Sequence, residues 1–454
     1  MATTKRTSTP LPIIHRHAAG IDIGSTFHVV AVPPGRDEEP VRTFRSFTCD
    51  LHRLADWLGS VGITTIAMES TSIYWVPVYE ILEARGFEVF LVNARDAKNV
   101  PGRKTDVNDA QWIQQLHEYG LLRGSFRPQE RIAALRAYLR HRERLVEYGA
   151  SHVQHMQKSL MQMNLQLHHV VSDITGATGM KIIRAIVGGE RSATILAEFR
   201  DVRCKASPES IREALTGNYR PEHVFALRQA VELYDLYQAK IHDCDVEIER
   251  TLATLNEERP VPTAPLPKPR TRSHPKNEPD FEIRSALYTL VGGIDLTQIH
   301  GLGPYAVLRL VGECGTDMTR WPTAKHFTSW LTLAPGCKIS GGKVLSSRTR
   351  RSANRATALL RLCAVTVGKT ATALGAFFRR LAARAGKSKA VTATARKIAV
   401  LFYNALRHGA SYVDPGANYY EERFRRRTLD NLRRRADALG FKLVAANPAA
   451  EGVS

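Results

Sequence analysis

Residues 20–32 read GIDIGSTFHVVAV, and this stretch decides the fold predicted for the first part of the chain. Apolar residues stand on both sides of a Gly-Ser-Thr turn, a pattern typical of a strand, a tight turn and a second strand. Side chains alternate along a strand, so Ile21 and Ile23 share one face and Asp22 lies on the other. The first strand therefore carries an acid on the face opposite its isoleucines.

The same kind of patterning continues for about sixty residues beyond this hairpin. Further strands are expected at residues 41–48, 63–68 and 87–92. Asp50 is expected to cap a helix, and a second helix at residues 73–85 should stop at Gly86, a residue suited to a helix C-terminus. A third helix follows the last strand, so the order predicts an α/β sheet.

Four acids fall at related places in this predicted sheet. Asp22 is in the first strand, Glu69 ends the fourth, and Asp106 with Asp109 begins the helix after the fifth, within the stretch KTDVNDA at residues 104–110. Functional groups gather at the carboxyl ends of parallel strands, and oxygen ligands suit Mg²⁺ or Mn²⁺, which support phosphoryl transfer. Taken singly, the acids have simpler interpretations: Asp106 as a helix cap, Asp109 as a partner of the helix dipole, and Glu69 as a solvated carboxylate.

The overall charge points to a nucleic-acid partner. The chain has 454 residues, enough for about three domains, and 64 Lys and Arg against 44 Asp and Glu give a formal charge of +20. No run of 18 apolar residues indicates a membrane span, so we expect a cytoplasmic, nucleoid-associated protein of bacterial type that binds no membrane. The six cysteines lack Cys-x-x-Cys spacing, which argues against disulfides and zinc.

Two long helices are predicted in the middle of the chain. Apolar heptad positions run through residues 132–167, with Arg142 and Gly149 as exceptions, and a second series spans residues 224–255. Periodicity alone leaves open whether they pair within one chain or across a dimer. The Pro-rich, basic stretch that follows has the composition of a semi-rigid linker.

The last third contains two candidate phosphate-handling segments. Gly301 and Gly303 precede a helix, where backbone N–H groups can bind a phosphate, although a plain tight turn explains them equally well. Ser340 lies on a glycine-flanked loop. A serine needs activation to attack a phosphate, and nearby cations can stabilise the transition state, although Ser-Gly-Gly in isolation is usually a turn. These cations are Lys338, Lys343, Arg348, Arg350 and Arg351.

The N-terminal hairpin admits one further interpretation. Sugar and acetate kinases and actin-like ATPases also begin with an acidic, Gly- and Ser/Thr-bearing hairpin that wraps phosphate. Those folds need a second such hairpin, and the sequence has none. A kinase is therefore the weaker hypothesis.

Residues 19–123 resemble the RuvC-like four-acid domain of the Piv-type insertion-sequence transposases, the family that includes the bridge-RNA-guided recombinases. The matching stretches are GIDI at 20–23, MEST at 68–71 and KTDVNDA at 104–110. Later stretches match the family's C-terminal transposase domain in order: residues 334–335, 340–341, 352–354, 389–390 and 395–397. Ala353 stands where the family commonly has glycine. In all, the resemblance covers residues 19–165 and 285–415.

The resemblance implies an RNase H-like sheet in which Asp22, Glu69, Asp106 and Asp109 bind Mg²⁺ or Mn²⁺. It also implies that Ser340 is the nucleophile of a DNA recombinase, and that a guide RNA and a dimer or tetramer joined by a coiled coil take part. We expect nucleic-acid contacts at Lys104, Gly301, Gly303, Lys338, Lys343, Arg348, Arg350, Arg351, Arg355, Arg396 and Lys397. Two rival functions are a RuvC-like nuclease that uses metal-activated water and a non-catalytic nucleic-acid-binding assembly protein.

The predicted organisation has six segments, with an α/β RNase H-like domain first, a helical coiled coil next and a mainly α transposase domain last. They are a basic arm at 1–16, the metal domain at 17–128, the coiled coil at 129–256, the Pro-rich linker at 257–281, the serine domain at 282–415 and a basic extension at 416–454.

Overall fold

The computed structural model describes residues 12–93, 106–270 and 275–444, and the side chains of residues 106–108 lie outside that description. The chain forms two compact units, residues 1–127 and 128–454. No helix in the described part is both long and apolar enough to cross a membrane.

The first unit is built on a mixed five-stranded sheet in the order β3-β2-β1-β4-β5. β1 (Ala18–Ile23), β2 (Phe27–Ala31) and β3 (Val41–Arg45) form an antiparallel meander. β4 (Thr65–Glu69) and β5 (Glu88–Val92) continue the sheet parallel to β1. This arrangement confirms the predicted RNase H-like α/β fold.

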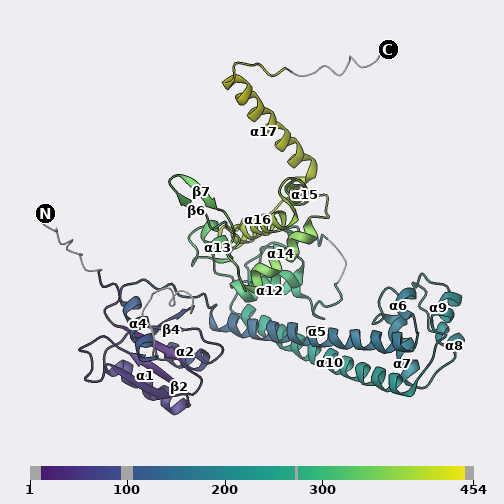
Figure 1. Cartoon of the computed structure of the whole chain (residues 1–454), viewed down its shortest axis with the longest axis horizontal. Helices are drawn as coiled ribbons and strands as arrows, with labels where there is room; N and C mark the ends of the chain where they lie inside the picture. Colours follow the sequence, from purple (N-terminus) through teal and green to yellow (C-terminus); the bar gives the residue numbers. More distant parts are fainter. Residues whose placement is uncertain (1–11, 94–105, 271–274, 445–454) are drawn as a thin grey trace, which may run out of the picture. The chain divides into compact units, whose positions relative to one another are not determined.

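Helices cover both faces of the sheet (Figure 1). α1 (Thr48–Ser60) and α2 (Trp75–Ala84) contribute to a core that includes Ile21, Ile23 and Met68. α4 (Asp106–Glu118) packs on the other face, where Ile113 meets Ala67 and Val92. The alternation predicted for the first strand is therefore confirmed, because its isoleucines face α1 and α2.

Two predicted helix ends have different outcomes. Gly86 follows α2 with φ of +85°, as expected of a glycine after a helix C-terminus. Asp50 does not cap α1, because the helix begins at Thr48 and Asp50 lies in its first turn. There its carboxylate is buried and pairs with Arg45 at 3.2 Å and with Arg53.

The second unit begins with two long helices that pack along each other, α5 (Glu130–Gln162) and α10 (Pro221–Glu257). The two heptad series therefore pair within one chain. Between them the chain forms a lobe of α6 (Leu167–Val170), α7 (Ala177–Val187), α8 (Ala193–Glu198) and α9 (Pro208–Ala214). Leu160, Ile183 and Leu227 share the apolar core of this lobe.

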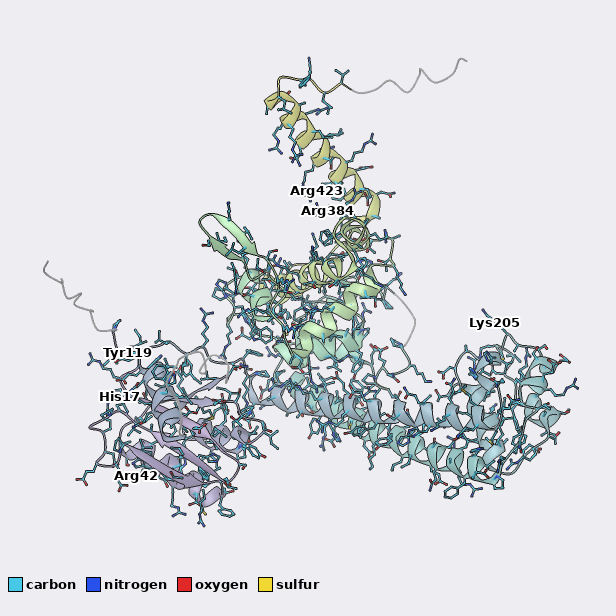
Figure 2. All side chains as sticks on the ribbon, in the orientation of Figure 1. His17, Arg42, Tyr119, Lys205, Arg384 and Arg423 are labelled. Carbon is cyan, nitrogen blue, oxygen red and sulfur yellow. The ribbon has the colours of Figure 1, made fainter. Side chains whose placement is uncertain are left out.

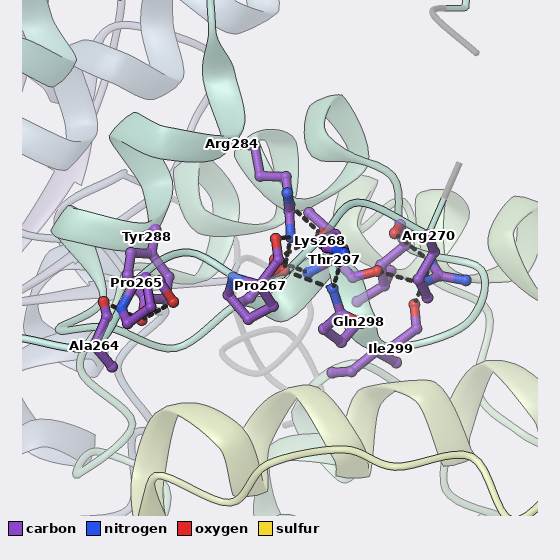
Figure 3. A network of polar contacts seen from close by, with 12 residues as sticks. Ala264, Pro265, Pro267, Lys268, Arg270, Arg284, Tyr288, Thr297, Gln298 and Ile299 are labelled. Carbon is purple, nitrogen blue, oxygen red and sulfur yellow. Dashed lines mark hydrogen bonds and ion pairs between the residues drawn. The ribbon is translucent and has the colours of Figure 1, made fainter. Parts of the chain in front are cut away.

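The Pro-rich segment after α10 runs along α11 (Ile283–Leu290) and the short helix η1 (Leu296–Gln298) (Figure 3). The Tyr288 hydroxyl donates to the carbonyl of Ala264 at 3.0 Å, and Arg284 donates to that of Pro267 at 2.6 Å. Side chains of the ordered helices thus satisfy carbonyls that proline-rich backbone cannot pair internally.

In the part of the second unit that the structure describes, the remaining elements are helices and one hairpin. The helices are α12 (Pro304–Cys314), α13 (Ala324–Trp330), α14 (Arg355–Val367), α15 (Ala373–Ala385), α16 (Lys387–His408) and α17 (Gly416–Ala438). Phe327, Phe402 and Tyr403 are buried together, and the Tyr403 hydroxyl donates to the Trp321 carbonyl at 2.7 Å. Every residue of α17 is at least partly exposed, so the basic extension forms a helix with little core of its own.

Candidate active site

Asp22 and α4 occupy the same face of the first unit's sheet. A Cβ atom on Gly20 would lie 2.3 Å from the backbone nitrogen of Gln114 and 2.4 Å from the carbonyl oxygen of Ala110, so α4 rests directly on this glycine. Gly20 and Asp22 are two residues apart in β1 and point to the same side. Asp22 therefore lies on the α4 face, half-buried.

Glu69 reaches the same face from the neighbouring strand. It ends β4 two residues after Ala67, which packs on Ile113 of α4. β1 and β4 run parallel with Ile21 opposite Met68, so Asp22 and Glu69 stand at adjacent strand ends. Glu69 is only 9% exposed, which is unusual for a carboxylate and indicates a specialised environment.

Asp109 lies in the first turn of α4, the helix that packs on this face. Asp109 precedes Ala110, and Ala110 packs against Val29 and Ala31 of β2. Val29 is the cross-strand partner of Asp22. The prediction that Asp106 begins the helix is confirmed, although its side chain, like all of Lys104, lies outside the described residues.

This donor set has the chemistry of a divalent-cation site. Asp22 and Glu69 stand at one corner of the sheet, Asp109 lies in the first turn of the helix packed on the same face, and hard cations such as Mg²⁺ take carboxylate oxygens as ligands. Among the side chains that the structure describes, which exclude Asp106, no three Asp, Glu, His or Cys residues form a ready cation cage. The residues thus fit Mg²⁺ by chemical type and by the face of the sheet on which they lie.

A histidine at the opposite end of α4, which sequence reasoning missed, anchors the helix to the sheet. His117 is 1% exposed and shares a 2.9 Å hydrogen bond with the Thr65 hydroxyl. Its ring stacks on that of His15 with centroids 4.7 Å apart. Burial, helped by the charge of nearby His15, lowers the pKa of His117 to about 4. The helical spacing from Ile113 to His117 was the available signal, since it places both residues on the sheet-facing side.

Ser340 lies at the tip of a hairpin in the second unit. It ends β6 (Lys338–Ser340) and pairs in register with Lys343, the first residue of β7 (Lys343–Ser346). Gly341 and Gly342 form the two-residue turn, with φ of +54° and +74°. Ser340 is thus a strand residue beside the turn rather than a loop residue, because the two glycines suffice to reverse the chain.

The hairpin is exposed on both sides. Ile339, Val344 and Leu345 are each more than 60% exposed, an unusual placement for three apolar side chains. The predicted cations Lys338, Lys343, Arg348, Arg350 and Arg351 are exposed as well, on the hairpin or directly after it. The structure therefore gathers Ser340 and five positive charges on one accessible stretch.

Arg355, a predicted nucleic-acid contact, forms an ion pair with an acidic side chain. It begins α14 and donates to Glu143 of α5 at 3.0 Å, and Glu143 also pairs with Arg309 of α12. The preceding Asn354 caps α14, since its side-chain oxygen accepts from the amide of Thr357 at 3.1 Å. The Ser-Ala-Asn stretch at residues 352–354 thus leads into α14 and supplies its N-cap.

The Gly301 to Gly303 stretch forms a tight turn against α14. Gly301 has φ of +94°, and a Cβ there would lie 3.1 Å from the Cys363 carbonyl. Arg270 donates to the carbonyls of Thr297, Ile299 and Leu302 at 2.7 to 3.2 Å, which holds the turn from the Pro-rich side. The turn borders a cavity of about 240 Å³.

The helix after this turn also has a partner for its N-terminus. Gly303 is the residue before α12, and the amide of Tyr305 donates to the Glu278 carboxylate at 3.3 Å. The carboxylate thus accepts a hydrogen bond from one of the backbone amides that could otherwise donate to a phosphate. Arg396 and Lys397, the last two predicted contacts, lie on α16, and the Lys397 ammonium sits 4.5 Å from the centroid of the Phe377 ring.

Two family models match the chain. Residues 19–165 match a DEDD-type transposase model named for IS110, and residues 295–377 match the transposase IS116/IS110/IS902 family. The first match spans the sheet, α4 and α5, and the second spans the Gly301 turn and the Ser340 hairpin. A search among curated proteins found no match.

Proposed function

Because the chain belongs to the IS110 family of transposases, phosphoryl-transfer enzymes that act on DNA, we propose that it cuts and rejoins DNA with a serine nucleophile and a carboxylate-held metal. The observation that supports the proposal is that Asp22 and Glu69 stand at adjacent strand ends, at one corner of the sheet, on the face where the helix that carries Asp109 packs. Such a corner, in a basic protein, suits the handling of a DNA phosphate.

In this proposal the acids that hold the cation come from two strands and one helix. Asp22 and Glu69 are fixed by adjacent strands, and Asp109, with Asp106, is carried by the first turn of α4. A bound Mg²⁺ or Mn²⁺ would stabilise the charge that develops on the phosphate oxygens. α4 packs directly on Gly20. This contact fixes how far the acids at the start of α4 lie from the acids on the strands.

Ser340 supplies the nucleophile in this proposal. Its hydroxyl oxygen bonds to phosphorus, one P–O bond of the DNA strand breaks, and the released strand end takes up a proton while the serine loses its own. The resulting phosphoserine link keeps the bond energy that rejoining needs. Lys343, directly across the hairpin from Ser340, and the exposed arginines that follow provide positive charge for the transition state.

The proposal extends to the assembly. The metal corner and Ser340 belong to different units of the chain, so they meet either within one chain or between subunits of a dimer or tetramer. The family resemblance favours the second arrangement and a structured guide RNA. Sequencing of RNA that copurifies with the protein tests the guide: an enriched RNA partly complementary to target DNA supports it, and an unenriched RNA pool contradicts it.

The covalent step has a direct test. The protein is incubated with labelled insertion-sequence end DNA and Mg²⁺, denatured, and examined for a protein–DNA adduct. We expect the adduct with the unchanged chain and with Ser346→Ala on the same hairpin, and no adduct with Ser340→Ala. Strand cleavage that persists in Ser340→Ala without any adduct would instead identify a nuclease that uses water.

The metal corner is tested separately. Asp109→Asn removes one negative charge without changing the size of the side chain, so we expect DNA binding to persist and cleavage to be lost. Mg²⁺ should raise the melting temperature of the unchanged chain and have a smaller effect on Asp22→Asn. Unchanged cleavage by Asp109→Asn would show that the acids only cap the helix.

A further inference from the structure

α15 and α17 enclose a groove of about 810 Å³ in the second unit. Five arginines line it, Arg380 and Arg384 from α15 and Arg427, Arg434 and Arg435 from α17, and none of the described residues that line it is acidic. Figure 2 labels Arg384 beside this junction of α15 and α17. A groove lined by one sign of charge concentrates ligands of the opposite sign.

The arginines are placed by helical spacing. Arg380 and Arg384 are one turn apart on α15, and Arg427 and Arg434 are two turns apart on α17, so each pair projects from one face of its helix. Two rows of positive charge thus border the groove. Repeated charges along a groove suit a ligand with repeated negative charges.

The charge of α17 is positive overall, since the helix has seven arginines and four acids. Glu421 pairs with Arg380 at one end of the groove. Lys397 of α16 and Arg423 of α17 add positive charge next to it, and desolvation together with Arg423 and Arg427 lowers the pKa of Lys397. A lowered lysine pKa agrees with an excess of positive charge among these helices.

Aromatic side chains form part of the groove wall. Phe377 and Tyr420 meet edge to face with ring centroids 6.2 Å apart, and the guanidinium of Arg380 lies 3.7 Å from the centroid of the Phe424 ring. All three rings are partly exposed and border the groove. Aromatic rings and arginine planes between positive charges are the combination on which unpaired bases stack.

We propose that the groove between α15 and α17 binds a single strand of nucleic acid, with its phosphates on the arginines and its bases against Phe377, Tyr420 and Phe424. A duplex would reach the arginines but leave the rings unused, since its bases are stacked inside. The ligand chemistry is shared by unpaired DNA and unpaired RNA. Binding here needs neither the acids of the first unit nor Ser340.

The test measures binding by the full chain in EDTA, which separates it from any cleavage. Fluorescence anisotropy is followed with labelled 16-nucleotide poly-dT, poly-rU and a mixed-sequence duplex of equal length. We expect Arg427→Ala/Arg435→Ala to weaken both single strands about tenfold or more, and to reduce the steepness of the salt dependence by about 1.4, near 0.7 for each lost phosphate contact. The ratio of poly-dT to poly-rU affinity decides which source is preferred.

Arg425→Ala/Arg426→Ala is the matched control, because it removes the same charge from the same helix outside the groove. We expect it to change affinity less than threefold. Phe424→Leu keeps an apolar side chain but removes the ring, and should weaken single strands about fivefold while leaving the duplex unchanged. Equal losses in the two double variants, or equal loss of duplex and single-strand binding in Phe424→Leu, would overturn the proposal.

Discussion

Arg142 of α5 and Asp245 of α10 form a buried ion pair across the interface of the two long helices. Each residue is less than 5% exposed, and one guanidinium nitrogen of Arg142 donates to Asp245 at 3.2 Å while another pairs with its second oxygen. Arg142 also donates to the Asn277 carbonyl at 2.9 Å and lies over the Tyr305 ring. The pair thus joins both helices to the segment that leads into α12.

Removal of one partner should strongly destabilise the second unit. Asp245→Asn leaves the Arg142 charge buried without its counter-ion, and such losses cost about 3 to 5 kcal/mol. We expect Arg142→Leu/Asp245→Leu to be less destabilising than either single change. Urea unfolding followed by far-UV circular dichroism measures the midpoints. A double variant as unstable as the sum of the singles would show that the two side chains are not coupled.

The close packing of α4 on the sheet depends on the absence of a side chain at Gly20. Gly20→Ala places a methyl group 2.3 to 2.4 Å from backbone atoms of Gln114 and Ala110, which no side-chain rotation relieves. We expect a loss of about 2 kcal/mol or more in the stability of the first unit, with reduced DNA cleavage because the acids on α4 shift. Gly59→Ala is the control, because its Cβ meets nothing within 4 Å near the end of α1 and should raise stability slightly. Normal melting and normal cleavage by Gly20→Ala would contradict this account.

Alternation predicted the faces of β1, whose isoleucines enter the core with α1 and α2. β4 is buried along its whole length, so its position followed from an apolar run rather than from alternation. Alternation placed Asp22 opposite the isoleucines, which the structure shows to be the α4 face. The helix at Asp106 was predicted from its acids and the helical pattern that follows them. The heptad pattern does not predict the pair of Arg142 and Asp245, although Arg142 is an exception in its heptad series. Periodicity indicates which residues of a helix face a partner. It does not indicate which polar residues lie opposite each other when the two helices are far apart in the sequence.

The Ser340 hairpin shows a different limit. Ser-Gly-Gly indicated a turn, but the flanking residues lack the buried, alternating pattern by which strands are recognised, and all three residues of β6 are exposed. The two strands are held by backbone pairing, which the amide of Gly336 extends by donating to the Arg348 carbonyl at 3.0 Å, and not by a buried face. The contact of Glu278 with the start of α12 could not be predicted either. The Pro-rich segment has no periodicity that would indicate where Glu278 lies.

His117 should make the first unit sensitive to acid. Its folded-state pKa of about 4 lies below the ordinary value of 6.5, so the unfolded chain takes up the proton first as the pH falls. The stability that comes from neutral His117 is fully present above pH 6.5 and is lost between pH 6.5 and 4, by at most about 1.4 kcal/mol per pH unit. His117→Gln should be less stable at pH 7.5 but lose less on acidification, as measured by thermal melting at pH 7.5 and 5.0. Equal losses in both proteins would assign the acid sensitivity to other groups.

The turn glycines should control how Ser340 is presented. Gly342 has φ of +74° and Gly341 +54°, so a β-branched residue at either position strains the turn, whereas asparagine tolerates this conformation. We expect Gly341→Asn to keep DNA rejoining within about threefold and Gly342→Val to reduce it more than about tenfold with little change in melting temperature, because the hairpin is exposed and contributes little to the core. A plasmid recombination assay and thermal melting measure the two quantities. If Gly342→Val rejoins DNA as well as Gly341→Asn does, the register that sets Ser340 opposite Lys343 is not needed for the reaction.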